Sequence, residues 1–350
     1  MNETRRPGSS RATASPSVEL AKAIRSGDRT ALARGITLVE STAATHRDQA
    51  EQLLQQLQGG APDAYRIGIT GMPGVGKSTL IDALGSKLTA TGSKVAVLAV
   101  DPTSTRSGGS LLADKTRMNR LANDPHAFVR PSPSGAAPGG VSVATREAIL
   151  LCEAAGYDPV FVETVGIGQA EAGVAAMVDV LVLMLLPGAG DELQGLKRGV
   201  LELADVVLIN KADGNLHAAA LAAQQHYAHA LRIVRAAGSE RHRSGQHILT
   251  TSALREADVE ALWNQLSALR RRSLHNAHAA LREQRLRTWL WQQLENHVLG
   301  RLHGDEQLAV RVDALILDVL ADRTRPSQAR SELLASLPGS TGGAPRAESQ

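Results

Sequence analysis

A glycine-rich loop that ends in a lysine and a serine occupies residues 71–79, where the chain reads Gly-Met-Pro-Gly-Val-Gly-Lys-Ser-Thr. Glycines let backbone N–H groups turn toward a phosphate chain without Cβ clashes. Lys77 supplies a cation for the β- and γ-phosphates, and the hydroxyl of Ser78 is a ligand for Mg²⁺. The pattern therefore predicts a phosphate-binding loop. The residues expected to contact a nucleotide here are Gly71, Met72, Pro73, Gly74, Val75, Gly76, Lys77, Ser78 and Thr79.

The segments on both sides of this loop have the patterns that such a loop needs. Residues 66–70 form a short apolar run that predicts a strand entering the glycines. After the loop, Leu80, Ile81, Leu84 and Leu88 fall on one face of a helix, and the positive N-terminus of that helix completes an anion site. The alternative, a chance glycine-rich turn between a strand and a helix, does not require both flanks.

A second motif, Asn210-Lys211-Ala212-Asp213, follows a β-rich run over residues 203–209. Ligands bind at the carboxyl ends of strands in parallel sheets. A carboxylate at Asp213 can accept hydrogen bonds from N1–H and the 2-amino group of guanine, which adenine does not offer, so the motif predicts GTP. An ordinary polar turn at a strand end is the alternative. The residues expected at the base are Asn210, Lys211, Asp213, Ser252, Ala253 and Leu254.

Three carboxylates follow apolar runs or lie in a polar loop in the middle of the chain. Asp101 ends the strand pattern 95–100, and Glu163 ends the pattern that begins at Val160. Asp114 lies in a glycine- and serine-containing loop. Carboxylates at the same sheet edge as the phosphate loop can hold Mg²⁺ or its water. The alternative is that one or more of them caps a helix.

Composition limits the class of protein. A net charge of +3 in 350 residues gives no general indication of nucleic-acid binding. The single cysteine, Cys152, cannot form an internal disulfide and suits the reducing cytoplasm. No run approaches the ~20 apolar residues of a membrane span, so no membrane partner is expected. The most apolar run, residues 177–186, is interpreted as a buried parallel strand.

The order of patterns predicts an α/β fold, a P-loop NTPase with a mostly parallel sheet flanked by helices, plus N- and C-terminal helical extensions. Strands are expected near Ile67, Val95, Val160, Val180, Val206 and Ile248. The expected parts are a disordered leader (1–16), a helical N-terminal extension (17–60), a GTPase domain (61–258), a helical C-terminal dimerisation arm (259–337) and a disordered tail (338–350).

The expected arm carries two apolar ladders at helical spacing, with Trp289 and Trp291 beside the first. Two ladders exceed what one surface helix needs to dock on its own domain, so they favour a homodimer. The alternative is a helical hairpin that packs only on itself. The ladders are Leu286, Leu290, Leu294 and Val298, then Leu308, Val312, Leu315 and Val319.

Taken together, these motifs and five further runs resemble one family, the methylmalonyl-CoA-mutase-associated GTPases of the MeaB/ArgK type. The fifth run is the most specific, since generic GTPases lack it. The runs are Val-Asp-Pro-Thr-Ser (100–104), Ser-Gly-Gly-Ser-Leu-Leu-Ala-Asp-Lys-Thr-Arg-Met (107–118), Arg-Pro-Ser-Pro-Ser (130–134), Val-Glu-Thr-Val-Gly-Ile-Gly-Gln (162–169) and Pro-Gly-Ala-Gly-Asp-Glu-Leu-Gln-Gly-Leu-Lys (187–197).

The resemblance implies a GTPase chaperone of an adenosylcobalamin-dependent acyl-CoA mutase, with methylmalonyl-CoA mutase as the first candidate. Such proteins gate cofactor loading, protect or reactivate the mutase, and usually form homodimers. The implied ligands are Mg²⁺ with GTP or GDP, with no tightly bound organic cofactor of the chain's own. The implied Mg²⁺ set is Ser78, Asp101, Asp114 and Glu163, and the implied catalytic set is Lys77, Asp101, Glu163 and Lys197.

Within that resemblance, Lys197 ends a loop that is expected to relay the presence of the partner. Four positions in or near the switch segments depart from the family's usual residues, so coupling to a partner is less firmly implied than nucleotide binding. These positions are Ala113, Ala136, Pro138 and Ala170.

Three other functions compete with this reading. A nickel metallochaperone GTPase would present a Cys/His cluster, whereas Cys152 is alone and His217, His226 and His229 fit a solvent-facing helix. A transport-associated kinase or ATPase would not need the guanine-reading motif. A module that binds GTP without turnover would not need Lys77 together with Glu163.

Overall fold

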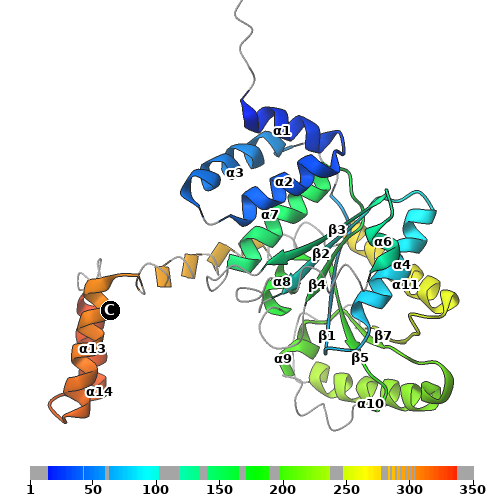
Figure 1. Ribbon diagram of the computed structural model, residues 1–350. Helices are drawn as coiled ribbons and strands as arrows, with labels where there is room; N and C mark the ends of the chain where they lie inside the picture. The colour runs from blue at the N-terminus through cyan, green and yellow to red at the C-terminus, as the bar shows by residue number, and fades with distance from the viewer. Residues whose placement is uncertain are drawn as a thin grey trace, which may run out of the picture. The chain divides into compact units, whose positions relative to one another are not determined.

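The computed structural model of the chain describes most of an α/β core and two terminal helical regions (Figure 1). It divides into two compact units, Met1–Leu290 and Trp291–Gln350, and each is considered by itself. The described residues are 15–41, 43–59, 63–101, 118–133, 140–164, 171–188, 198–236, 247–276 and 304–336, with single residues and pairs between 283 and 302. The expected leader (1–16, apart from Ser15 and Pro16) and tail (338–350) lie outside them.

The first unit is built on a parallel sheet of seven strands in the order β3-β2-β4-β1-β5-β6-β7, and the α/β fold expected from the sequence is confirmed. The strand order places β1 in the middle, with neighbours on both sides, so the loop that follows β1 is central. The strands are β1 (Arg66–Gly71), β2 (Val95–Asp101), β3 (Ala127–Pro133), β4 (Val160–Thr164), β5 (Val180–Leu185), β6 (Val206–Ile209) and β7 (His247–Thr250).

Strand β3 was not among the expected strands. Its sequence, Ala-Phe-Val-Arg-Pro-Ser-Pro, carries Pro131 and Pro133, which cannot donate to a sheet ladder. These prolines fit the sheet because β3 is an edge strand, which has β2 as its one neighbour in the seven-stranded order. Prolines are tolerated on such an edge. Periodicity alone could not indicate this, because the edge position depends on the order of strands in space.

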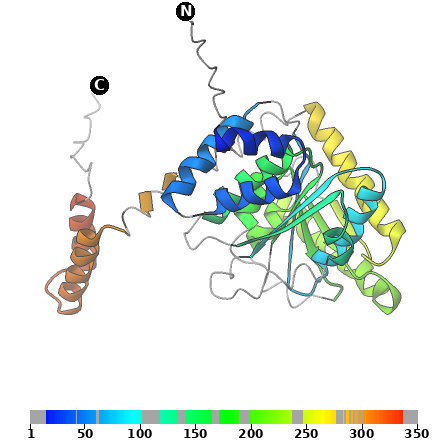
Figure 2. The same ribbon diagram turned by 45° about the horizontal axis from the view of Figure 1, so that its top comes forward.

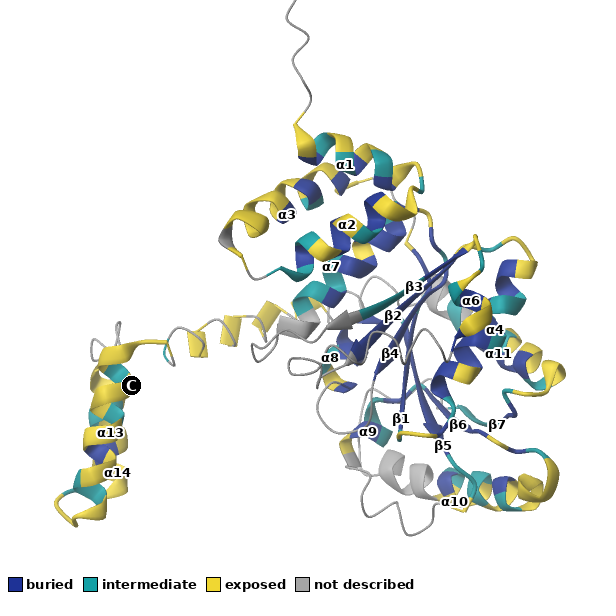
Figure 3. Ribbon diagram, in the orientation of Figure 1, coloured by how far each residue is buried: buried dark blue, intermediate teal, exposed yellow. Residues whose placement is uncertain are grey.

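Helices cover both faces of the sheet, and alternate residues of one strand feed two separate cores. In β2, Leu98 and Val100 enter a core shared with α7 and the N-terminal helices. Val95 and Val97 enter the core beneath α4 and α11 on the other face. Figure 2 shows the sheet with helices on both sides, and in Figure 3 the strands are mostly coloured as buried while the helices carry both buried and exposed residues. The covering helices are α4 (Lys77–Ala90), α6 (Asn119–Ala122), α7 (Gly140–Ala154), α8 (Glu171–Met177), α9 (Arg198–Leu203), α10 (His217–Ala236) and α11 (Glu256–Asn276).

The N-terminal residues form three helices, α1 (Pro16–Arg25), α2 (Arg29–Glu40) and α3 (Ala44–Leu57), which pack together and onto α7. Asp28 caps α2, since its carboxylate accepts hydrogen bonds from the N–H groups of Thr30 and Ala31. Ile24 and Leu53 are fully buried between these helices. This packing gives the amphipathic helices the apolar partner that they lack as isolated segments.

Helix α11 packs with the sheet, although most of its residues fall in the arm that the sequence predicts over residues 259–337. Val259, Leu262 and Leu266 recur at the spacing of one helical face and are all buried in the core beneath α4. The hydroxyl of Tyr65 donates a hydrogen bond to the carbonyl of Leu266. The compact unit that holds the sheet accordingly extends to Leu290.

In the second unit, α13 (Glu306–Leu320) packs against α14 (Pro326–Ser336) as a helical hairpin. Within the second apolar ladder, Leu315 is buried and Leu308, Val312 and Val319 are half-buried. Other large apolar side chains of α13, including Leu317 and Leu320, are exposed. The first ladder is divided between the units, with Leu286 and Leu290 in the first and Leu294 and Val298 in the second, and all four side chains are exposed. Trp291 is also exposed, whereas Trp289 lies outside the described residues.

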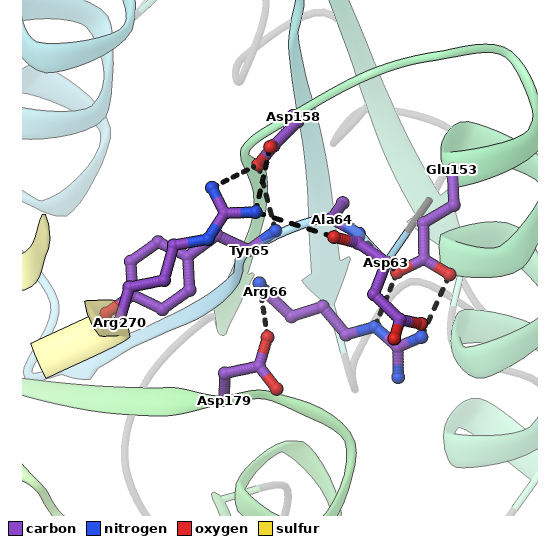
Figure 4. A network of polar contacts seen from close by, with 8 residues as sticks. All are labelled: Asp63, Ala64, Tyr65, Arg66, Glu153, Asp158, Asp179 and Arg270. Carbon is purple, nitrogen blue, oxygen red and sulfur yellow. Dashed lines mark hydrogen bonds and ion pairs between the residues drawn. The ribbon is translucent and has the colours of Figure 1, made fainter. Parts of the chain in front are cut away.

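A network of buried and half-buried polar groups joins the amino end of β1 to its neighbours (Figure 4). The Arg66 guanidinium donates from Nε and Nη2 to the two carboxylate oxygens of Glu153, at 2.7 and 2.9 Å. Burial alone would lower the pKa of Arg66, but the hydrogen bond and the charge of Glu153 raise it above its ordinary value. The backbone N–H of Arg66 donates to Asp179, and that of Tyr65 donates to Asp158.

The same network includes α11, because Arg270 pairs with Asp158 and lies over the ring of Tyr65, 5.2 Å from its centroid. A backbone N–H at the start of a strand must find an acceptor when it is buried. The carboxylates of Asp158 and Asp179 supply those acceptors for two successive residues of the chain. The amino end of the central strand is therefore held by charged hydrogen bonds from three other segments.

We predict that Glu153→Ala lowers the free energy of unfolding by about 3–5 kcal/mol, because it leaves the buried Arg66 charge without this carboxylate. Urea unfolding followed by circular dichroism measures the change. Glu19→Ala serves as the matched control, since its partner Lys22 and Glu19 itself are both well exposed, and its effect should be under about 1 kcal/mol. Equal effects of the two variants would contradict the prediction.

Candidate functional site

The loop between β1 and α4 is shaped by glycines in two close approaches. Gly76 has φ +100°, and a Cβ at that residue would lie 2.6 Å from Nδ2 of Asn210. A Cβ at Gly71 would lie 2.5 Å from the carbonyl oxygen of Met184 in β5. Side chains at these positions would collide with fixed groups, so only glycine lets the loop fold back this tightly. Backbone N–H groups in such a turn can surround an anion.

Lys77, the first residue of α4, lies within the loop and is only 7% exposed. Its Nζ donates hydrogen bonds to the carbonyls of Gly71 at 2.7 Å and Met72 at 3.1 Å. A compact ammonium held at a helix N-terminus adds its charge to the positive end of the helix dipole. The loop therefore combines a cation, a helix terminus and turned-in backbone, which is the chemistry that a phosphate chain requires.

Glu163 of β4 meets Ser78 of α4 beside this loop. The Ser78 hydroxyl donates to Glu163 Oε1 at 2.8 Å, and the two residues are 9% and 5% exposed. One residue further along β4, the hydroxyl of Thr164 donates to that of Thr70 in β1, also at 2.8 Å. Both contacts follow from the parallel register, which pairs Ile69 with Glu163. A buried carboxylate and a hydroxyl at the phosphate loop form a pair of hard oxygen donors.

These oxygen donors fit a magnesium ion, which prefers carboxylate and hydroxyl oxygens and shares its shell with phosphates. The backbone of Asp101 ends β2 at the same sheet edge, where Ala99 pairs with Glu163 and Val100 pairs with Thr164. The side chain of Asp101, and all of Asp114, lie outside the described part of the chain. So do Lys197 and the four departures at Ala113, Ala136, Pro138 and Ala170.

A pocket of about 350 Å³ opens next to the phosphate loop, between the ends of β6 and β7. It brings together the predicted base-reading residues from two loops that are forty residues apart in the sequence. Asp213, the residue that the sequence predicts to accept from guanine, lines this pocket. The full lining is Gly76, Thr79, Asn210, Lys211, Asp213, Gly214, Asn215, Leu216, Ser252, Ala253 and Leu254.

Asn210 connects the base pocket to the phosphate loop. Its Nδ2 donates to the carbonyl of Val75 at 2.7 Å, and its Oδ1 accepts from the N–H of Ala253 at 3.3 Å. The next residue, Lys211, adopts φ +59°, which is uncommon for a residue with a side chain and occurs at functional turns. The amide of Asn210 thus spans two loops that would contact different parts of one nucleotide.

Sequence reasoning missed some members of this site. Gly214, Asn215 and Leu216 line the base pocket from the short 3₁₀ helix η2 (Gly214–Leu216). They directly follow the guanine-reading motif, and that adjacency was the available signal. The Thr70–Thr164 hydrogen bond joins residues 94 positions apart. Nothing in the local pattern of either residue predicts it, because it depends on the β1–β4 register.

The structure gives three further observations. Among the residues that it describes, no group of three or more His, Cys, Asp or Glu side chains could hold a metal ion by themselves. Cys152 is buried in an apolar core, and burial raises the pKa of its thiol. None of the described helices is long and apolar enough to cross a membrane.

Comparison with known proteins gives consistent matches. A family model described as "Methylmalonyl Co-A mutase-associated GTPase MeaB" matches residues 32–307. A Mycobacterium tuberculosis protein named "Probable GTPase" is 47% identical over 318 residues, covering 90% of this chain and 93% of its own. The Mus musculus "Methylmalonic aciduria type A homolog, mitochondrial" is 41% identical over 319 residues, covering 88% and 76%. A solved structure described as a "LAO/AO transport system kinase" is 34% identical with a TM-score of 0.75, covering 93% and 98%.

We predict that Glu163→Gln lowers kcat for GTP hydrolysis on the order of 10²-fold and raises the Mg²⁺ concentration needed for half-maximal rate. The amide keeps the size of the side chain and can still accept from Ser78, but it removes the negative charge. Steady-state phosphate release, measured across a Mg²⁺ titration, tests this.

Glu260→Gln is the control for that experiment, since its carboxylate lies on α11 and pairs with Lys87. Lys77→Ala gives the other reference and should abolish hydrolysis and weaken nucleotide binding. A Mg²⁺ requirement in Glu163→Gln equal to that of the native chain would remove Glu163 from the proposed ion site.

Proposed function

The chain belongs to the MeaB family of methylmalonyl-CoA-mutase-associated GTPases, and we propose that it is the GTP-hydrolysing chaperone of an adenosylcobalamin-dependent acyl-CoA mutase. The observation that carries this proposal is the buried Ser78–Glu163 contact at the phosphate loop, next to a base pocket that contains Asp213. This combination fits a GTPase that uses Mg²⁺. Methylmalonyl-CoA mutase is the proposed partner, because the family description names it and the mouse relative is named after methylmalonic aciduria.

In the proposed mechanism, the chain's residues hold the nucleotide at three points. The turned-in backbone of the loop and Lys77 bind the phosphates, and Ser78, Asp101, Asp114 and Glu163 would hold the ion. When bound, Mg²⁺ would neutralise charge that develops on the phosphate oxygens. Asp213 orients the base, so that the phosphates are presented in one register to Lys77. Phosphoryl transfer depends mainly on such positioning and charge stabilisation.

Coupling to the mutase is proposed to run through the loop at residues 187–197, which carries Lys197. Asp191, Glu192 and Lys197 give this loop charges that can exchange partners between two states. No glutamine that could position water directly follows Gly166. Slow basal hydrolysis that rises when a partner orders the loop would follow from this. A cytoplasmic site of action is part of the same proposal, since the only cysteine is a buried free thiol.

We predict that the purified chain co-elutes with methylmalonyl-CoA mutase in the presence of a non-hydrolysable GTP analogue and Mg²⁺. We also predict that the mutase stimulates GTP hydrolysis on the order of tenfold or more, because partner binding orders the catalytic loop. Size-exclusion chromatography and phosphate release measure the two effects. Lys197→Ala should respond less to the mutase than the native chain. If the chain neither co-elutes with the mutase nor responds to it, the chaperone role is contradicted. The GTP-hydrolysing activity would not be affected by that result.

The exposed ladder of the C-terminal region supports a proposed homodimer. Its four side chains are about half exposed and recur at helical spacing in the sequence, and exposed apolar groups of this kind often mark an interface. Light scattering at micromolar concentration should give twice the mass of one chain. Leu294→Glu should shift this mass toward the monomer, whereas Leu221→Glu, at an exposed leucine on α10, should not. A monomeric native chain would reject the dimer.

A further inference from the structure

The loop after β7, residues 251–254, forms one wall of the base pocket through Ser252, Ala253 and Leu254. Leu254 is 80% exposed, so its side chain contributes little buried surface to hold the loop in place. A wall that recognises a base must be held close to its binding geometry, because looseness in a recognition loop costs affinity and selectivity. What fixes the backbone of this loop therefore bears on how the base is recognised.

Several hydrogen bonds fix this loop, and three of them join it to residues 209–212 at the end of β6. The N–H of Thr251 donates to the carbonyl of Ile209 at 2.9 Å, and the carbonyl of Thr251 accepts from Ala212 at 3.0 Å. The Asn210 amide accepts from Ala253. These contacts join the loop to the neighbouring base-reading loop, so neither loop provides an anchor that is independent of the other.

Asp258 supplies an anchor from outside both loops. It lies in the first turn of α11, and its Oδ2 accepts from the N–H of Ser252 at 2.8 Å. The guanidinium of Arg255 donates to the same oxygen from Nε at 3.0 Å and from Nη2 at 2.7 Å. Asp258 does not line the pocket. Helix α11 is itself fixed, since Val259 and Leu262 are buried in the core beneath α4.

We propose that Asp258 is a positioning residue for guanine recognition, because its carboxylate holds the 252–254 loop in the geometry that reads the base. From Asp258 the hydrogen bonds continue through the loop to Asn210 and on to the carbonyl of Val75 in the phosphate loop. The inference rests on the GTPase activity of the family and does not depend on the mutase partner. It places part of nucleotide selectivity in a side chain that the base does not touch.

A simpler role for Asp258 is to stabilise the N-terminus of α11, where carboxylates interact favourably with the helix dipole. The two roles make different predictions. Loss of a helix-stabilising group lowers the fraction of protein that is able to bind, which lowers the apparent affinity for every nucleotide by the same factor. Loss of a loop anchor lowers the affinity for guanine nucleotides more than the affinity for adenine nucleotides, because only guanine uses the base-reading contacts. The ratio of GDP to ADP affinity therefore separates the roles.

The test measures the affinities of GDP and ADP for the full-length chain, by competition against a fluorescent GDP analogue. In Asp258→Ala we expect the GDP-to-ADP affinity ratio to fall about tenfold, the equivalent of one hydrogen bond to a charged acceptor. In Asp258→Asn the neutral oxygen can still accept from Ser252, but such bonds are about half as strong, so a fall of roughly threefold is expected.

Glu260→Ala is the matched control, because it removes a carboxylate from the same helix that pairs with Lys87 and not with the loop. Its GDP-to-ADP ratio should stay within about twofold of the native value. An unchanged ratio in Asp258→Ala overturns the proposal, and so does an equal loss of GDP and ADP affinity. If Asp258→Ala does not fold, an unchanged ratio in Asp258→Asn overturns it instead. A native chain without preference for GDP would count against the nucleotide assignment itself.

Discussion

The hydrogen bond between Ser78 and Glu163 depends on a feature of the whole sheet, and the candidate active site depends on that bond. The two residues are 85 positions apart and meet at 2.8 Å only because β1 and β4 lie side by side in parallel, with Ile69 opposite Glu163. A shift of one residue in this register would turn the Glu163 side chain to the other face of the sheet. The geometry of this contact is therefore as exact as the register of two largely buried strands.

The polar groups at the two ends of the central strand have different tasks. At the amino end of β1, Glu153 accepts from the side chain of Arg66 and Asp179 accepts from its backbone N–H, so the polar groups at this end stabilise the fold. At the carboxyl end, Lys77 and Glu163 lie at the glycine loop that the sequence predicts to bind a phosphate chain. A strand that is anchored at one end can hold its other end rigidly. A binding loop that follows such a strand is therefore held more precisely than a loop without that support.

Asn210 and α11 extend this rigidity to the base pocket. Asn210 joins the phosphate loop and the 252–254 loop through the two polar atoms of its amide. The two loops are therefore held in a fixed position relative to one another. Helix α11 packs beneath α4 and also reaches the base loop through Asp258. The result is that phosphate and base recognition share one scaffold, although the residues involved come from distant parts of the chain.

The sequence by itself determined the local features of this protein. Residues 71–79 and 210–213 carry their chemistry in their own spacing, and the alternation of apolar runs predicted a parallel α/β sheet, because periodicity reports which face of an element is buried. Tertiary structure decided the rest. It placed the proline-containing strand β3 at an edge, assigned α11 to the sheet, and brought Asp258 to Ser252 and Thr164 to Thr70. Such contacts depend on the order and register of strands in space, which no local pattern encodes.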